Sequence, residues 1–337
     1  LELALEPGLV LVVGRNGVGK TNLLEALHVA TQGFSPRTRA EGELIRFGAA
    51  AGRIALRGSR GPTPIELELT LRRGEGKVAK LNGAPLRAAE QLRAEVATLV
   101  FTPDRLAVVK AGPAARRAYF DRVLGRLFPA RAELPIAYGA ALGQRNAALR
   151  RVGLGVSDRE TLAPWTAQVA VLGAELQEAR RAVLAELAPL AAARADELGL
   201  PGVALEHSGA EPTVEELERR LPRDLERGAT SVGPHLDEIV LRAGDRELRS
   251  YGSQGEQRLT VLALLLAEAE LIQERRGIAP LLLLDDVLSE LDPGRREQLA
   301  LRLERLGQTV VTATTAGALP RSPAQLLEVT PGAVVTR

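Results

Sequence analysis

The two ends of the chain alternate short apolar runs with helical repeats of apolar positions. Residues 8–13 form an apolar run between glycines, which is typical of a buried strand. Residues 20–32 carry apolar side chains at helical spacing and stop at Gly33, which predicts a helix. Residues 52–86 alternate apolar and polar positions between glycine-rich breaks and predict hairpins, and 95–101 reads as one further strand.

The middle of the chain has a different pattern. From Pro113 to about Arg227 it is rich in Ala, Leu, Arg and Glu, with helical periodicity and almost no strand signal. Helix-breaking residues divide this stretch into several helices, namely Pro129, Pro135, Gly153, Gly155, Pro164, Pro201 and Pro222. No heptad repeat is sustained, so a long coiled coil is not expected.

Alternating strand and helix patterns return after Val232. The expected strands cover 238–242, 279–284 and 309–312, and the expected helices cover 254–275 and 293–305. The order predicts an α/β fold with mixed sheets and helices, split by an inserted all-α arm. We place the head at residues 1–112 and 230–337, and the arm at 113–229.

Composition narrows the class of protein. The chain has 337 residues, 45% hydrophobic and 26% charged, with no Cys and three His. These values exclude disulfide scaffolds, Cys metal sites and thiol catalysis, and they argue against a His-rich metal site. No apolar run approaches the ~18 residues of a membrane span, and no basic-then-apolar leader is present, so neither a membrane protein nor a secreted one is expected.

The start of the chain carries two expectations. The chain begins at Leu1 and contains no Met, so we expect a short N-terminal piece to be missing. The alternation Leu1-Glu2-Leu3 predicts the interior of a strand.

Residues 14–21 fit the phosphate-loop pattern G-x-x-x-x-G-K-[ST]. They are Gly14, Arg15, Asn16, Gly17, Val18, Gly19, Lys20 and Thr21. The loop falls between a predicted strand and a predicted helix, where its amides can cradle phosphate oxygens. Lys20 can reach the β- and γ-phosphates, and the Thr21 hydroxyl can ligate Mg²⁺. The cofactors expected are therefore ATP and Mg²⁺.

A second apolar run, 281–284, ends in Asp285 and Asp286. Acids at the carboxyl end of a buried parallel strand lie where α/β folds bind ligands. We expect Asp285 to hold Mg²⁺ through water and Asp286 to polarise the attacking water. Two acids after a strand can also form a simple turn. Asp292 and Pro293 downstream are typical of a helix start.

Residues 251–258 open the longest helix of the second half. Ser253 and Glu256 match the capping box S-x-x-E, which is common structural chemistry. In a functional interpretation, the Ser253 hydroxyl and the Gly255 amide face a γ-phosphate held by another subunit. Both interpretations can hold together, because a capping serine can also face a phosphate.

The order of these motifs is that of ABC-type ATPase heads, and the chain resembles the RecF family in the SMC-like branch of those ATPases. Asn22 directly follows the phosphate loop, as in that family. Further matching blocks are Phe101-Thr102-Pro103-Asp104, Lys110, Gly112-Pro113, Arg116-Arg117, Tyr119-Phe120-Asp121, Gln144-Arg145-Asn146, Thr230, Gly233-Pro234-His235 and Asp237. Leu236, Glu238 and the pair Asp104-Arg105 depart from the family pattern.

The resemblance implies an ABC-type P-loop ATPase head and a weak, DNA-stimulated ATPase whose catalytic residues are Lys20 and Asp286. It implies an ATP-dependent homodimer on duplex and gapped DNA, which helps RecA loading with RecO and RecR in recombinational repair, replication-fork maintenance and the SOS response. The expected location is cytoplasmic and nucleoid-associated, without a membrane partner. Because Asp286 is shorter than the Glu usual in ABC heads, we expect slow turnover.

Basic side chains are concentrated in two places. Residues 53–80 carry seven basic side chains against three acidic ones, and the predicted arm begins with several arginines. Cationic side chains bind the phosphate backbone without sequence preference, and 3% aromatic residues leave little surface for base stacking. The candidate DNA contacts are Arg57, Arg72, Arg73, Lys77, Arg116 and Arg117. In the alternative interpretation, these basic side chains only form an exposed, hydrated surface.

Three other classes remain open. A transporter ATPase subunit needs a surface that couples to a membrane partner, and an SMC-type structural protein needs a long coiled coil. A P-loop kinase needs a lid and an acceptor pocket but no S-x-G motif. Pelleting with membranes, contour length and phosphorylation of a small acceptor distinguish these classes.

Overall fold

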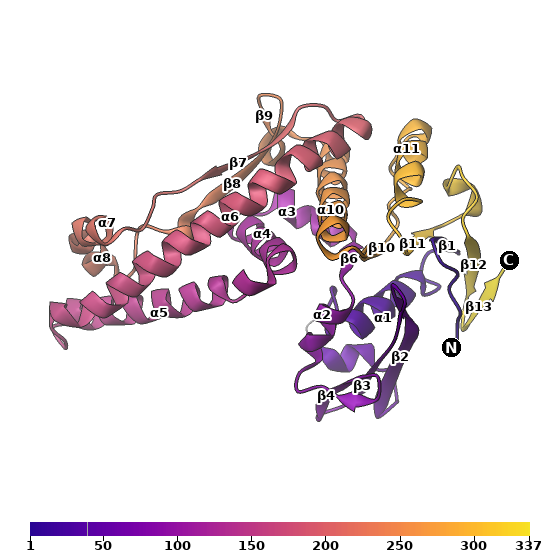
Figure 1. Ribbon diagram of the computed structural model, residues 1–337, viewed down its shortest axis with the longest axis horizontal. Coiled ribbons are helices and arrows are strands. Elements are labelled where there is room, and N and C mark those ends of the chain that lie inside the picture. Colours follow the sequence, from indigo (N-terminus) through magenta and orange to yellow (C-terminus); the bar gives the residue numbers. More distant parts are fainter. Residues whose placement is uncertain (39) are drawn as a thin grey trace. The chain divides into compact units, whose positions relative to one another are not determined.

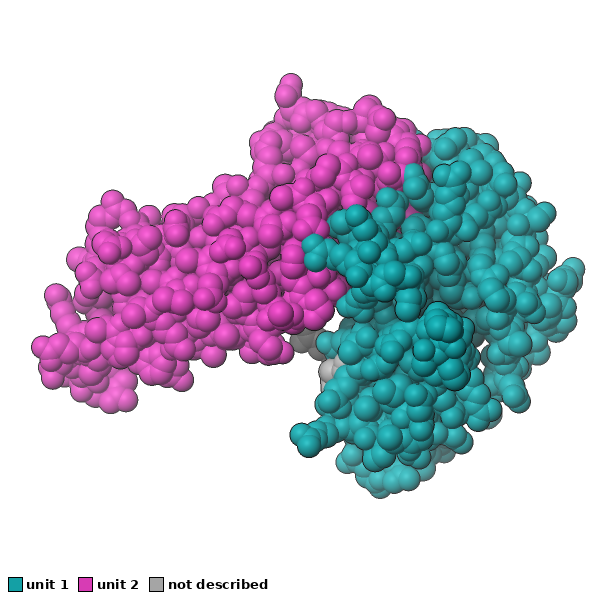
Figure 2. Space-filling view, in the orientation of Figure 1, with its two compact units in different colours: residues 1–105, 269–337 teal, residues 106–268 magenta. Residues whose placement is uncertain are grey.

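The computed structural model describes residues 1–38 and 40–337. The chain divides into two compact units, residues 1–105 with 269–337, and residues 106–268 (Figure 2). The boundary of the second unit falls inside helix α10 (Gln254–Arg276). The units therefore differ in extent from the head and arm expected from sequence, and that division stays a prediction.

A six-stranded sheet forms the centre of the first unit, in the order β13-β12-β1-β11-β10-β6. Its strands are β1 (Leu9–Val13), β6 (Thr98–Phe101), β10 (Leu281–Leu284), β11 (Thr309–Ala313), β12 (Gln325–Thr330) and β13 (Ala333–Thr336). All neighbours run parallel except the β12–β13 hairpin. Every residue of β1 is buried, as expected for an inner parallel strand. The hairpin at the carboxyl end had no counterpart among the predicted strands.

Helix α1 (Lys20–Gln32) packs between two sheets of this unit (Figure 1). Leu24 and Leu27 join the core of the six-stranded sheet, whereas Val29 joins the core of a second, antiparallel sheet. The second sheet is the predicted hairpin region, and its order is β2 (Ala51–Arg60), β3 (Thr63–Arg72), β4 (Gly76–Leu81) and β5 (Ala84–Pro85). Helix α1 is thus held by apolar contacts on both sides.

The remaining regular elements of the first unit are short. They are α2 (Leu92–Glu95), α11 (Pro293–Leu303), and the 3₁₀ helices Glu41–Leu44, Ala89–Gln91 and Ala316–Ala318. The 3₁₀ helix Pro103–Leu106 ends where the second unit begins.

The first residues of the chain do not form the predicted strand. Residues 1–6 contain no regular element. The Gln325 side chain takes over the backbone groups that a neighbouring strand would pair. Its Oε1 accepts from the Glu6 amide at 3.0 Å, and its Nε2 donates to the Ala4 carbonyl at 3.0 Å. Alternation alone therefore misidentified an extended segment as a strand.

Helices dominate the second unit. They are α3 (Ala107–Lys110), α4 (Pro113–Leu127), α5 (Leu134–Gly153), α6 (Ala163–Glu197), α7 (Val214–Arg219), α8 (Leu221–Arg227), α9 (Leu248–Tyr251) and the start of α10, with 3₁₀ helices Pro129–Arg131, Arg159–Leu162 and Pro234–Leu236. Helices α5 and α6 lie side by side (Figure 1). Across the part of the chain that the structure describes, no helix has the length and apolar character needed to cross a membrane.

One strand lies inside the stretch predicted to be all helical. Strand β7 (Val203–Ser208) pairs antiparallel with β8 (Glu238–Ala243), and β8 continues to β9 (Arg246–Glu247). Its partner is distant in sequence, so the strand is stabilised by pairing that no local window contains. The helical character of the other elements agrees with the prediction.

Candidate functional site

The phosphate loop connects the end of β1 to the start of α1. A Cβ added to Gly14 would lie 2.5 Å from the Val329 carbonyl oxygen of β12, so only glycine fits there. Gly19 has φ 108°, in the left-handed region, and it is the N-cap of α1 without a side-chain cap. Gly19 has no side chain that could cap the first amides of the helix, so this end of α1 is suited to an anion.

Lys20 points back into the loop that precedes it. The side chain is buried, and its Nζ donates to the carbonyl oxygens of Gly14 at 2.7 Å and Arg15 at 3.0 Å. The ammonium group is therefore held by carbonyl oxygens of the loop itself, which keeps a positive charge where a phosphate would need it. The predicted loop residues form one local structure.

Asp285 brings the acidic strand against the phosphate loop. It follows β10 directly and is 9% exposed. The Thr21 hydroxyl donates to Asp285, with Oγ1 to Oδ2 at 3.0 Å and Oγ1 to Oδ1 at 3.3 Å. The two residues predicted to hold Mg²⁺ are thus in contact although 264 positions apart. Hydroxyl and carboxylate oxygens are ligands that suit Mg²⁺, so the donor set fits this metal.

Asp286 lies in a different environment from its neighbour. Its side chain is exposed, and its backbone has φ 49°, the left-handed region that non-glycine residues seldom occupy. The amide of Asp286 donates to the Thr312 hydroxyl at 2.9 Å, and that hydroxyl donates to Asp285 Oδ1 at 2.7 Å. Sequence reasoning singled out no role for Thr312. The available signal was a threonine at the end of the expected strand 309–312, the next strand along the chain after the acids.

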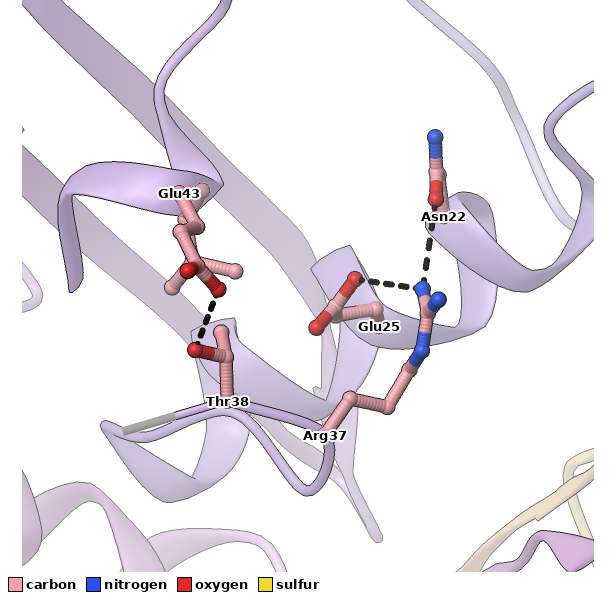
Figure 3. Close-up of a pocket in the computed structure, with 6 residues that line it drawn as sticks. Asn22, Glu25, Arg37, Thr38 and Glu43 are labelled. Atoms are coloured by element: carbon pink, nitrogen blue, oxygen red, sulfur yellow. Dashed lines mark hydrogen bonds and ion pairs between the residues drawn. The ribbon is translucent and has the colours of Figure 1, made fainter. Parts of the chain in front are cut away.

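A hollow of about 500 Å³ lies beside the first turns of α1 (Figure 3). Its lining is Asn22, Glu25, Arg37, Thr38, Glu43 and Leu44. Arg37 Nη1 lies 3.1 Å from Glu25 Oε2 and 3.5 Å from Asn22 Oδ1, so the guanidinium faces α1 (Figure 3). Asn22, predicted to belong to the nucleotide site, therefore borders this hollow directly after the loop.

Ser253 forms the predicted capping box at the start of α10. Its amide donates to Glu256 Oε2 at 2.8 Å, and the Glu256 amide donates to the Ser253 hydroxyl at 3.2 Å. Hydrogen bonding from Arg246 lowers the pKa of Glu256 below its ordinary value, so the acid is ionised at neutral pH. Ser253 and Gly255 are both exposed. Asp292 likewise caps α11 by accepting from the Arg295 amide at 2.9 Å.

Most arginines of the predicted DNA surface have acidic partners. On the solvent face of the second sheet, Arg57 pairs with Glu66 at 2.8 Å. Arg72 pairs with Glu75 at 3.3 Å. Other pairs that involve this sheet include Lys77 with Glu41, Arg53 with Glu68, Lys80 with Glu68, and Arg60 with Glu95. Arg73 donates from Nε to the Ala49 carbonyl at 3.2 Å. The excess of basic residues in the sequence is therefore largely compensated by local pairing.

Arg116 does not suit a DNA contact. It is 2% exposed, its Nη1 donates to the Ala111 carbonyl at 2.8 Å, and its Nε donates to Glu238 at 2.9 Å. Arg117 is half-buried and donates to the Asp237 carbonyl at 2.7 Å, and burial lowers its pKa. Sequence counting cannot distinguish a solvated arginine from a buried one, and this is why Arg116 was misassigned.

The motif blocks of the second unit meet in a buried polar network. Arg145 of α5 donates to Asp224 at 2.9 Å and to the Thr230 hydroxyl at 2.7 Å. Arg180 of α6, absent from the predictions, bonds both oxygens of Asp121 at 2.8 and 2.9 Å. Other members are Asn146, Gln177, His207, Pro234 and Asp237. These blocks have a structural role here.

Pro103 and Asp104 belong to another of the matching blocks, and their side chains lie outside the described part.

Comparisons with known proteins agree with this geometry. The RecF/RecN/SMC N terminal domain family matches residues 1–334. The DNA replication and repair protein RecF of Anaeromyxobacter dehalogenans (strain 2CP-C) is 40% identical, over 94% of this chain and 88% of the relative. The solved structure of the recombination mediator protein RecF-ATP in the RecFOR pathway has a TM-score of 0.85 at 26% identity, covering 99% of this chain and 93% of that one.

An SMC head bound to the C-winged helix domain of ScpA is similar in fold, with a TM-score of 0.60 at 17% identity and coverage of 98% and 90%. The predicted fold class, an ABC-type ATPase head with a helical insertion, is therefore confirmed. The chain belongs to the RecF family of DNA replication and repair proteins.

Proposed function

We propose that this protein is an ATP-dependent DNA-binding protein of recombinational repair and replication-fork maintenance. ATP closes two copies into a dimer on duplex DNA near single-strand gaps, and slow hydrolysis opens it. The observation that carries the proposal is the Thr21–Asp285 contact at 3.0 Å, which joins the phosphate loop to the acidic strand at one sheet edge. This arrangement is typical of P-loop ATPases.

Each residue of the site has a role in that proposal. The loop amides and Lys20 bind the phosphates, and Thr21 and Asp285 hold Mg²⁺. Bound Mg²⁺ supplies positive charge that offsets the charge developing on the phosphates. Asp286, exposed at the carboxyl end of β10, accepts a hydrogen bond from the attacking water. Ser253 and Gly255 of a second copy complete the site, which supports a homodimer as the active form.

The DNA and protein partners follow from family membership. We propose that the protein helps RecA loading with RecO and RecR, and that it works in the cytoplasm on the nucleoid. Arg57, Arg72, Arg73 and Lys77 remain candidate DNA contacts, whereas Arg116 is withdrawn because it is buried. Exposed ion pairs contribute little to stability, so arginines of this kind can exchange a carboxylate for a phosphate.

The test measures ATP hydrolysis against protein concentration, with and without duplex DNA at fixed salt. The wild-type rate per subunit should rise with concentration and with DNA, because the complete site needs two copies. Lys20→Met and Ser253→Arg should both lower the rate, since the first removes the phosphate-binding ammonium and the second blocks the other copy.

A rate that is independent of concentration and DNA, and unchanged by Ser253→Arg, would leave Ser253 as a helix cap alone. The proposal would then give way to a monomeric P-loop enzyme such as a kinase, which phosphorylation of a small acceptor would detect. Co-sedimentation with membranes would instead favour a transporter subunit.

A further inference from the structure

Thr312 lies at the centre of the six-stranded sheet, between the strand that leads to the phosphate loop and the strand that ends in the acids. On β11 it is paired with Val12 of β1, and it is fully buried. On the other side, Val311 pairs with Leu284, so Thr312 lies level with Asp285. Its hydroxyl is therefore the side-chain polar group that β11 contributes beside both acids.

The two hydrogen bonds of this hydroxyl have fixed directions. The backbone amide of Asp286 can only donate, so Thr312 Oγ1 accepts there, at 2.9 Å. The one hydroxyl hydrogen then goes to Asp285 Oδ1, at 2.7 Å. Thr21 donates to the other carboxylate oxygen, Oδ2, at 3.0 Å. Both carboxylate oxygens of Asp285 thus accept charge-assisted hydrogen bonds, which fix the plane of the carboxylate.

The same hydroxyl also holds the backbone that presents Asp286. A left-handed conformation at a non-glycine residue persists only where the surrounding structure stabilises it. At Asp286, with φ 49°, the bond from its amide to Thr312 supplies such a restraint. One buried hydroxyl therefore orients the acid that faces Thr21 and the acid next to it.

We propose that Thr312 is a positioning residue, which orients Asp285 for Mg²⁺ and Asp286 for the attacking water. The inference rests on the proposed ATPase function and deepens it. Partners that orient metal ligands typically contribute 10- to 100-fold in metal affinity or activity. Thr312 itself touches neither nucleotide nor water in this role, because it is fully buried and its hydroxyl bonds the Asp285 carboxylate and the Asp286 backbone amide.

The chain offers a matched control on the same strand. Thr309 is also fully buried on β11, and among the residues that the structure describes its hydroxyl has no hydrogen-bond partner. Replacing Thr309 by Val therefore makes the same chemical change in the same strand without touching the acids. If Thr312 had only the structural role of a buried threonine, Thr312→Val and Thr309→Val would have the same effect on Mg²⁺-dependent binding.

The test measures the affinity of a non-hydrolysable ATP analogue twice, once with Mg²⁺ and once with EDTA. The ratio of the two affinities isolates the metal's contribution from the loop's. Wild type should bind more tightly with Mg²⁺. Thr312→Val should lose about 10- to 100-fold of that gain, with its affinity in EDTA unchanged. Thr312→Ser, which keeps the hydroxyl, should restore most of the gain, and Thr309→Val should match wild type.

In hydrolysis assays Thr312→Val should lower kcat more than it raises KM, because Asp286 is displaced too. If Thr312→Val does not fold, Thr312→Ala is judged by the same ratio. A wild-type ratio in either folded variant would overturn the inference and leave the proposed function standing. A wild-type protein whose affinity does not respond to Mg²⁺ would instead contradict the proposed function itself.

Discussion

At the scale of single residues, the role of a side chain in this protein depends more on its burial than on its residue type. Asp285 and Asp286 are neighbours with the same side chain, yet the first is 9% exposed and the second faces solvent. His235 is held on both ring nitrogens, by the Tyr138 hydroxyl at 2.7 Å and the Thr230 carbonyl at 3.0 Å. A carbonyl only accepts, so Nε2 carries the proton and Nδ1 accepts from Tyr138.

We predict that His235 makes the second unit less stable in mild acid. Burial lowers the pKa of His235 below its ordinary value of 6.5, and the nearby Arg117 acts in the same direction, whereas Asp237 and Asp224 oppose it. Below that ordinary value the unfolded chain binds a proton that the native ring does not. Stability is therefore lost as pH falls through about 6.5, by at most about 1.4 kcal/mol per pH unit.

His235→Gln provides the comparison, because glutamine can donate to Thr230 and accept from Tyr138 without titrating. Urea unfolding followed by the fluorescence of the only tryptophan, Trp165 in α6, reports on this unit. Between about pH 7.5 and 5.5 the wild type should lose more stability than the variant. Parallel pH profiles would show that the ring is not the group responsible.

At the scale of elements, buried ion pairs connect helices of the second unit. Apolar contacts alone do not select one packing arrangement of these helices. Arg145 of α5 and Asp224 of α8 are 1% and 0% exposed, and their partner Thr230 lies in the segment that leads to β8. Arg180 of α6 bonds Asp121 of α4 in the same way. Each arginine spans two elements with directional bonds, so the pairs favour one packing arrangement over others.

Removing one partner of such a pair should cost far more than removing a surface pair. We expect Arg145→Met to lower the unfolding free energy by about 3–5 kcal/mol, because Asp224 stays buried without its counter-ion. Arg131→Met is the matched control, since Arg131 lies 3.6 Å from Glu178 with both side chains exposed, and should cost about 0–1 kcal/mol. Equal losses in the two variants would show that the buried pair is not a specific support.

The sequence predicted best those elements and sites that depend on residues close together in the chain. The strand–loop–helix order around residues 14–21, the Ser253 capping box and the bounds of helix α1 are as predicted, because glycine positions, caps and apolar spacing act within one or two turns. Strand β7 was missed because its paired residues in β8 are 30 to 40 positions away in the sequence. Arg116 was misassigned and Thr312 overlooked for the same reason. Burial and cross-strand contact depend on residues that no local window contains.

At the scale of the whole molecule, the proposed switch depends on a second copy. The capping serine and Gly255 are exposed at the start of α10, and the acids belong to the first unit. ATP can shift the balance toward a closed dimer only by binding that dimer more tightly than the open form. Blocking hydrolysis while keeping binding should therefore trap the closed dimer.

Asp286→Asn is the variant that separates these steps. Asparagine tolerates the left-handed backbone at this position, so the change removes the negative charge without adding strain. Hydrolysis should fall by about 10²- to 10⁴-fold, whereas ATP binding should persist. In sedimentation with Mg²⁺ and ATP, the variant should run as a dimer over a wider concentration range than wild type. Adding Ser253→Arg should return it to a monomer, and a monomer already in Asp286→Asn saturated with ATP would contradict the dimer clamp.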